Sequence, residues 1–261
     1  MPRRRLDTLL AERGLVGSRT SAAASVRAGQ VRIGADGPYA TKPSQLVADD
    51  AELVLTAPPR FVSRGGIKLE NALDSLGLEV SGLSCLDIGA STGGFTDCLL
   101  KRGASRVIAL DVAHGQLDWR LRNDPRVVVV ERRNARDLEP GELTPVPDLT
   151  TIDVSFISLG KVIPAVARCV RADGELLALV KPQFELGRGR APGGVVRSAE
   201  DRRDALRLAA RAAEAAGLAV RGFASSRLPG PKGNRETFLH ASRSPNEDAL
   251  DVEVAIHEVE P

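Results

Sequence analysis

The chain has 261 residues, of which 43% are hydrophobic and 27% charged, as in proteins that bury a core. Its net charge is only +2, but residues 244–261 carry six acids and no lysine or arginine, so residues 1–243 carry +8 and favour an anionic partner. No apolar run approaches the ~20 residues of a membrane helix. Three cysteines without a C-x-x-C pair indicate neither a disulfide framework nor a metal site. We therefore expect a cytoplasmic protein with reduced thiols, no metal and no membrane partner.

Residues 1–59 are expected to form a small α+β domain. Leu6, Leu9 and Leu10 share one face of a predicted helix, and Ser18 and Gly29 suit the two ends of a second helix. Residues 31–33 and 52–55 predict short strands. The cations of this domain form either a solvated face or a nucleic-acid surface, and the candidates are Arg3, Arg4, Arg5, Arg19, Arg27, Arg32 and Lys42.

The order of residues in this segment resembles the small RNA-binding domain of ribosomal protein S-four and its relatives. The motifs that carry the resemblance are Arg5-Leu6-Asp7, Leu9-Leu10, Ser18-Arg19, Val26-Arg27-Ala28-Gly29 and Gly34. The resemblance implies binding to RNA phosphates and RNA shape. Ala57-Pro58-Pro59-Arg60 predicts an extended linker, and we place the junction at residues 60–64, before a second domain over residues 65–243.

The second domain is predicted to be a doubly wound α/β fold. The predicted order of elements is a strand over 85–88, a glycine-rich turn, a helix to about 102 and a strand ending in Asp111. Sheets that bind a nucleoside have this arrangement, and a βαβ unit without a ligand is the alternative. No G-x-G-x-x-G is present, and the carboxylate of Asp87 would repel a pyrophosphate but suit the sulfonium cation of S-adenosylmethionine. Asp111 would accept hydrogen bonds from ribose hydroxyls. The remaining candidate cofactor contacts of the turn are Gly89, Ala90, Ser91, Thr92, Gly93, Gly94 and Phe95.

Further elements follow in order. A helix is predicted over 66–76, with Lys68 in its first turn, and a strand over 127–130 precedes Asn134 and Ala135, which lie beside the adenine or in an exposed turn. Strands over 149–156 and 174–184 carry Asp153 and Lys181 at their carboxyl ends. Helices are predicted over 159–170 and 199–216, and two late strands over 220–226 and 235–241 complete the fold. The cations expected to contact RNA in this domain are Arg64, Arg188 and Arg190. The acidic residues 244–261 predict a partly disordered tail.

Four charged residues stand out, which come from four separate segments and could converge only in the fold: Lys68, Asp153, Lys181 and Glu236. This lysine–carboxylate set resembles the tetrad of the FtsJ-like ribose 2′-O-methyltransferases. With the RNA-binding module, residues 3–243 resemble the TlyA family, often named hemolysins, which methylate cytidine 2′-hydroxyls in ribosomal RNA. The motifs are Ser63-Arg64-Gly65-Gly66-x-Lys68-Leu69, Asp87 to Phe95, Asp153 to Ser158, Lys181-Pro182-Gln183-Phe184 and Gly230-Pro231-x-Gly233-Asn234-x-Glu236.

The resemblance implies a Rossmann-like seven-stranded sheet with one late antiparallel hairpin, S-adenosylmethionine as cofactor, ribosomal subunits as partner and a monomer. It also implies that Lys181 is the general base. An amine must be neutral to accept a proton: burial and Lys68 favour neutrality, and Asp153 and Glu236 oppose it, so Lys181 is either a base or an orienting group. A methyltransferase with a small-molecule or protein substrate, a membrane-lytic protein and an RNA-binding protein with an inactive catalytic domain are the alternatives.

Overall fold

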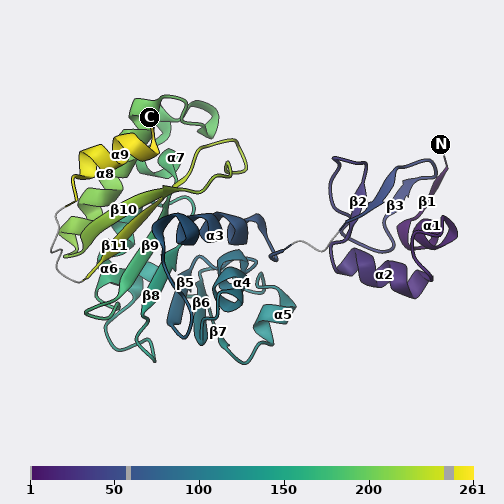
Figure 1. Ribbon diagram of the computed structural model, residues 1–261, viewed down its shortest axis with the longest axis horizontal. Helices are drawn as coiled ribbons and strands as arrows, with labels where there is room; N and C mark the ends of the chain where they lie inside the picture. The colour runs from purple at the N-terminus through teal and green to yellow at the C-terminus, as the bar shows by residue number, and fades with distance from the viewer. Residues whose placement is uncertain (1, 57–59, 244–249) are drawn as a thin grey trace. The chain divides into compact units, whose positions relative to one another are not determined.

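The computed structural model describes residues 2–56, 60–243 and 250–261 and divides between Arg60 and Phe61 into two compact units (Figure 1). Residues 57–59 of the expected linker lie outside the described residues. The junction expected at 60–64 is shorter in the structure, since Ser63 caps the first helix of the second unit and Arg64 begins it.

The first unit contains both predicted helices, α1 (Leu6–Glu12) and α2 (Arg19–Arg27), and both predicted strands, β2 (Val31–Ile33) and β4 (Leu53–Leu55), which pair antiparallel. The Ser18 hydroxyl accepts a hydrogen bond from the Ser21 N–H at 3.1 Å, as expected of a helix cap. A second pair, β1 (Arg3–Arg5) with β3 (Leu46–Ala48), was not predicted. Leu6, Leu10 and Val31 are fully buried in the core.

The second unit is built on a seven-stranded sheet in which six strands are parallel and one is reversed, as the sequence predicts. The strand that runs antiparallel to both of its neighbours is β11. In spatial order the strands are β10 (Ala219–Ser225), β11 (Thr237–Ser242), β9 (Glu175–Val180), β8 (Leu149–Ile152), β5 (Ser84–Ile88), β6 (Arg106–Asp111) and β7 (Val127–Glu131).

Alternate residues of each strand face two separate cores. On one face Cys85 joins Leu69 of α3 (Arg64–Leu76) and Leu99 of α4 (Gly94–Lys101). On the other face Leu86 joins residues of three helices, α6 (Ile163–Ala167), α8 (Ala199–Ala215) and α9 (Val252–Val259). The shorter elements are α5 (Trp119–Arg122), α7 (Pro182–Glu185) and 3-10 turns at Ala135–Asp137, Leu159–Lys161, Arg188–Arg190 and Pro192–Gly194.

The helix expected over 159–170 is interrupted. The structure has a 3-10 turn followed by α6, and Pro164 lies in the first turn of α6. A proline has no N–H to donate and therefore favours the start of a helix over its interior.

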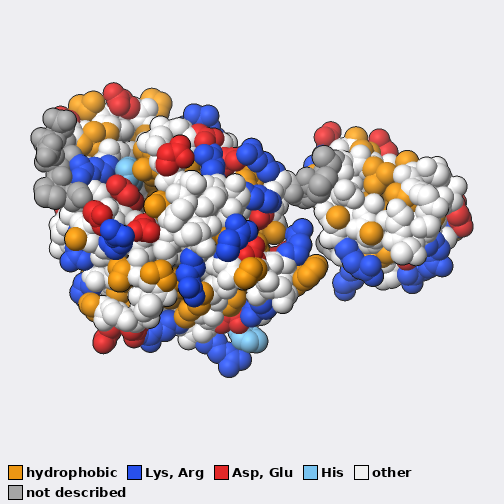
Figure 2. All heavy atoms as spheres, turned by 60° about the horizontal axis from the view of Figure 1, so that its bottom comes forward, with side chains coloured by type: hydrophobic (Ala, Val, Ile, Leu, Met, Phe, Trp, Pro, Cys, Tyr) orange, Lys and Arg blue, Asp and Glu red, His pale blue; other side chains and the backbone are white. Residues whose placement is uncertain are grey.

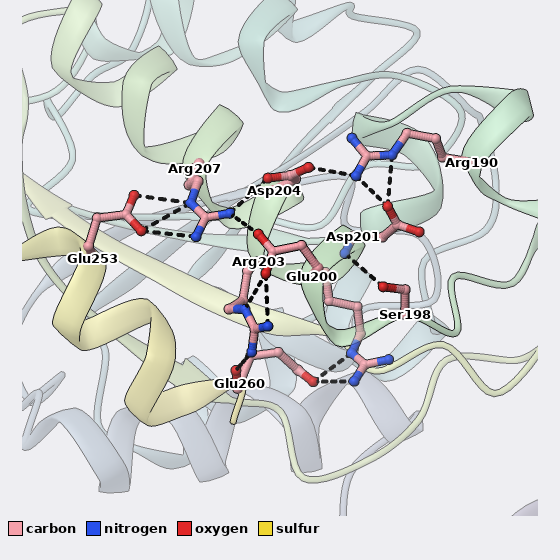
Figure 3. Close-up of polar contacts among 10 residues, drawn as sticks. Arg190, Ser198, Glu200, Asp201, Arg203, Asp204, Arg207, Glu253 and Glu260 are labelled. Carbon is pink, nitrogen blue, oxygen red and sulfur yellow. Dashed lines mark hydrogen bonds and ion pairs between the residues drawn. The ribbon is translucent and has the colours of Figure 1, made fainter.

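The expectation of a disordered tail is wrong for residues 250–261; residues 244–249 lie outside the described part of the chain. Asp251 caps α9, Ile256 is fully buried, and Val252 and Val259 pack on the same core. These apolar positions recur at helical spacing, so the tail is an amphipathic helix. Figure 3 shows Glu253 of α9 directed at Arg207 of α8. Glu260, which directly follows α9, pairs with Arg202 of α8 at 2.5 Å.

Candidate active site

The four candidate catalytic side chains meet at one edge of the sheet. Asp153 follows β8, Lys181 follows β9, and Glu236 precedes β11. Because β11 runs opposite to β9, its first residues lie beside the carboxyl end of β9, where Thr237 pairs with Val180. Lys68 comes from α3, which begins at Arg64, two residues before the expected start, so that Lys68 lies in the second turn rather than the first. All four residues line a cavity of about 620 Å³.

Two ion pairs hold these four side chains. Lys68 Nζ lies 2.5 Å from Glu236 Oε2, and the two side chains are only 10% and 1% exposed. Lys181 is paired with Asp153, and its Nζ also donates to Ser155 Oγ at 3.1 Å. Each lysine is therefore held by a carboxylate on a neighbouring element.

Two aromatic rings form the rim of the cavity. Phe156 is 90% exposed and packs against Phe184, with ring centroids 5.1 Å apart. Phe156 also has a φ of +65°, a left-handed conformation that is costly for a bulky residue. Glu185 connects the segment of Phe184 to the segment of Phe156, because it accepts hydrogen bonds from the Ser158 hydroxyl at 2.6 Å and the Leu159 N–H at 2.9 Å. Burial raises the pKa of Glu185.

The glycine-rich turn forms the opposite wall. Gly89 has a φ of +81°, and a Cβ atom there would lie 2.2 Å from the backbone oxygen of Asp153. Only glycine therefore allows β5 to end beside the end of β8. Gly93 instead lies under Leu117 and Leu121. The turn residues that line the cavity are Gly89, Ala90, Ser91, Thr92, Gly94 and Phe95.

Asp87 does not reach this cavity, contrary to the expectation of an acidic turn beside the cofactor. Its side chain is fully buried in β5 and accepts hydrogen bonds from the Thr96 hydroxyl at 2.7 Å and the Thr151 hydroxyl at 3.3 Å. Burial raises the pKa of Asp87 to about 7. The residue therefore joins β5, β8 and the start of α4 from beneath the turn.

The residues expected to hold a nucleoside lie on the other side of the turn. Asp111 lines a second cavity of about 10 Å³ that shares Ala90 and Ser91 with the large one. Its carboxylate accepts the Ser91 N–H at 2.7 Å and the Ala113 N–H at 2.8 Å. Asn134 accepts the Arg136 N–H, and Ala135 is buried in the core, so neither residue lines these two cavities.

Comparison with known proteins agrees with this geometry. A family model described as FtsJ-like methyltransferase matches residues 61–243. A relative from Mycobacterium tuberculosis, named 16S/23S rRNA (cytidine-2'-O)-methyltransferase TlyA, is 50% identical over 240 residues, which cover 91% of this chain and 89% of the relative. The chain belongs to the TlyA group of FtsJ-like methyltransferases.

Other TlyA relatives carry a different name. Hemolysin A of Brachyspira hyodysenteriae is 39% identical and aligns over 90% of this chain and 98% of its own length. The solved structure of a hemolysin-named protein from Streptococcus thermophilus has a TM-score of 0.74 and 39% identity, and covers 99% of this chain and 96% of its own. None of the helices in the described ranges is long and apolar enough to span a bilayer. Within those ranges there is also no cluster of three histidine, cysteine or acidic residues that could hold a metal ion.

The candidate RNA-binding cations of the first unit differ in their surroundings. Arg3, Arg19, Arg27 and Lys42 are exposed, and Figure 2 shows lysine and arginine side chains gathered along the lower side of this unit. Several of these cations have internal partners. Arg4 pairs with Glu12, Arg5 with Asp7 at 2.6 Å, and Arg32 lies over the Tyr39 ring.

The candidate cations of the FtsJ-like unit are also unequal. Arg64 lines the cavity and donates to the Pro229 carbonyl at 2.7 Å. Arg190 is exposed and pairs with Asp201 and Asp204 of α8 (Figure 3). The side chain of Arg188 lies outside the described part of the structure.

Several residues that line the cavity were not named as site residues from the sequence, among them Ser155, Phe156, Gln183 and Phe184. They lie within the motifs that begin at Asp153 and Lys181. Their position next to a predicted catalytic residue at a strand end is the signal that could have identified them.

Proposed function

We propose that this chain transfers a methyl group from S-adenosylmethionine to the ribose 2′-hydroxyl of cytidine in ribosomal RNA. The observation that carries the proposal is the meeting of Lys68, Asp153, Lys181 and Glu236 in one cavity beside the glycine-rich turn. The name of the Mycobacterium tuberculosis relative supports the substrate.

The residues of the cavity fit the cofactor. Its volume of about 620 Å³ is in the range of small-molecule sites. Gln183 Oε1 is buried without a hydrogen-bond partner among the described residues, and it offers an acceptor to a ligand N–H. The cavity wall at Asp153 and the Asp111 carboxylate suit a cation and ribose hydroxyls, although the small cavity at Asp111 must widen to admit a nucleoside. When bound, the cofactor supplies an electrophilic methyl group on a sulfonium cation.

The chain's own residues act on the ribose. The 2′-hydroxyl must lose its proton as its oxygen attacks, and Lys181 Nζ is the group that receives this proton or holds the oxygen in line. Asp153 and Ser155 fix the position of Nζ. The Lys68–Glu236 pair forms the neighbouring wall and keeps two buried charges in a fixed geometry. The exposed ring of Phe156, supported by Phe184, offers a stacking surface for the base of the target nucleotide.

The first unit supplies RNA affinity in this proposal. Its two helices, two strand pairs and exposed cations support the expected S-four-like RNA-binding domain. Such contacts act through phosphates, so binding should weaken as salt concentration rises.

The test is transfer of a labelled methyl group to purified unmodified ribosomal subunits, followed by mapping of the modified nucleotide. We expect wild-type protein to label a cytidine ribose, and Lys181→Ala to lose transfer at least 100-fold while still binding S-adenosylmethionine. Lys161→Ala removes an exposed lysine that does not line the cavity, and this control should remain active. Tight cofactor binding without transfer to either subunit or to intact ribosomes would refute the ribosomal substrate.

A further inference from the structure

The three most exposed large hydrophobic side chains of the described residues lie at the same edge of the sheet. Phe156, Trp119 and Val112 are 90%, 71% and 65% exposed. Val112 directly follows β6, Trp119 lies between β6 and β7, and Phe156 follows β8, so all three are on segments that leave the carboxyl ends of parallel strands. Single exposed apolar residues are common, but their concentration at the edge that carries the cavity is not.

Trp119 is held outward by a fixed helix. Leucine side chains pack α5 against the protein. Leu121 of α5 and the preceding Leu117 are buried and contact Gly93 of the glycine-rich turn. The Asp118 N–H donates to the Thr92 carbonyl at 3.2 Å, and the Asp118 carboxylate caps α5. Since Thr92 lines the cavity, Trp119 is one residue from a direct contact with the cavity wall.

The charges around Trp119 suit a polyanion. Residues 112–136 contain six arginines and three acidic residues, and four of these arginines pair with carboxylates: Arg120, Arg122, Arg126 and Arg133. The charge left for a polyanion is therefore that of Arg132 and Arg136. Arginine next to an exposed aromatic ring is the composition of surfaces that bind single-stranded nucleic acid, where bases stack on the ring and cations follow the backbone.

We infer that Trp119 stacks on an unpaired RNA base next to the target nucleotide and thereby holds the substrate strand across the cavity. This inference rests on the proposed function, because it requires an RNA substrate. It assigns to α5 a binding role separate from that of Phe156 at the cavity rim and from the proposed catalytic residue Lys181.

Trp119 is the only tryptophan of the chain, so its fluorescence reports directly on this contact. We expect a saturable decrease in its emission when a short single-stranded oligoribonucleotide rich in cytidine is added, and a smaller decrease with the same strand in a duplex. The matched control is the double variant Trp119→Phe, Leu208→Trp, which moves the reporter to an exposed site on α8. Its emission should change only by the absorbance of the added RNA.

Kinetics provide the second test. Trp119→Ala should raise KM for unmodified ribosomal subunits about 5- to 100-fold, the loss of one stacked base, with little change in kcat or in S-adenosylmethionine affinity. Trp119→Phe should retain most of the wild-type KM, because phenylalanine also stacks. A merely structural role for Trp119 would weaken cofactor binding instead, through the glycine-rich turn.

Equal quenching of both reporters, or an unchanged KM in Trp119→Ala, would overturn the inference. These outcomes differ from failure of the proposed function, in which wild-type protein itself does not methylate the subunits.

Discussion

Lys68 Nζ and Glu236 Oε2 lie 2.5 Å apart although 168 positions separate the two residues in the sequence. Removal of one partner would leave the other buried and unpaired, so Lys68→Met should lower the free energy of unfolding by about 3–5 kcal/mol. The double variant Lys68→Met, Glu236→Leu should recover much of this loss and remain inactive. Urea unfolding and methyl transfer measure the two quantities separately. Equal stability of the single variant and wild type would show that the pair is not formed.

The two partners of Lys181 should contribute unequally. Asp153 supplies a charge and Ser155 a neutral acceptor, and hydrogen bonds to charged groups are the stronger ones. Asp153→Asn is expected to reduce kcat at least 100-fold, and Ser155→Ala by about 10-fold or less. Single-turnover methyl transfer under saturating cofactor gives both numbers. A larger effect at Ser155 than at Asp153 would contradict the assigned geometry.

Asp87 should make stability depend on pH. Its pKa of about 7 in the folded protein lies above the usual 3.8, so the native state binds the proton more tightly than the unfolded state. The contribution of Asp87 to the free energy of unfolding is therefore fully present below about pH 4 and is lost as pH rises through 7. The Asp87→Asn variant has no carboxyl group to titrate and should not show this pH-dependent loss of stability. The difference in free energy of unfolding between the variant and wild type should therefore shift in favour of the variant by up to about 4 kcal/mol between pH 4 and 8. Urea unfolding across this range tests it, with the exposed Glu139→Gln as a control that leaves the slope unchanged.

Phe156 is expected to lower the stability of the protein while contributing to substrate binding. A left-handed backbone costs a residue with a Cβ atom about 1–2 kcal/mol relative to glycine. Phe156→Gly is therefore expected to be about 1 kcal/mol more stable than Phe156→Ala. Both variants should methylate ribosomal subunits poorly, because both lack the ring at the cavity rim. Thermal unfolding and methyl transfer on the same preparations decide the matter, and a fully active glycine variant would remove Phe156 from the substrate site.

The last helix should be part of the folding unit. Ile256 is fully buried whereas Val254, on the same helix, is 53% exposed. Ile256→Ala should cost about 2–5 kcal/mol, and Val254→Ala should change stability by less than about 0.5 kcal/mol. Denaturant titration of the two variants provides the comparison. Similar small effects at both positions would mean that α9 is not packed in solution.

The central sheet could be predicted because its strands are short apolar runs with clear ends, such as Val127 to Val130, and because one reversed strand follows from the late hairpin. The meeting of Asp153 and Lys181 was also predictable, since strand ends of a parallel sheet share one edge. Lys68 lies on a helix and Glu236 precedes an antiparallel strand, and these two were grouped with the others through the resemblance to the FtsJ-like tetrad. Residue types at strand ends thus carry most of the information about this site.

Other features depend on tertiary contacts that the local sequence does not specify. Asp87 is adjacent to the glycines in sequence, yet the alternation of a strand directs its side chain into the core beside Thr96 and Thr151. Arg190 lies in a basic loop, but it forms ion pairs with Asp201 and Asp204 of α8, which follows this loop in the sequence. The C-terminal segment was predicted to be partly disordered because it is acidic, and the helical spacing of its apolar residues Val252 and Ile256 was overlooked.

The contact between Gly89 and the Asp153 backbone has a consequence for how this protein can change. Every side chain at position 89 would collide with the Asp153 carbonyl, so mutation there shifts the segment that carries Asp153, one of the proposed catalytic residues. An inhibitor that rests on Gly89 would therefore contact a position where any substitution also displaces Asp153. Natural variation in cofactor affinity is expected at Thr92 or Gln183, where side chains border open space.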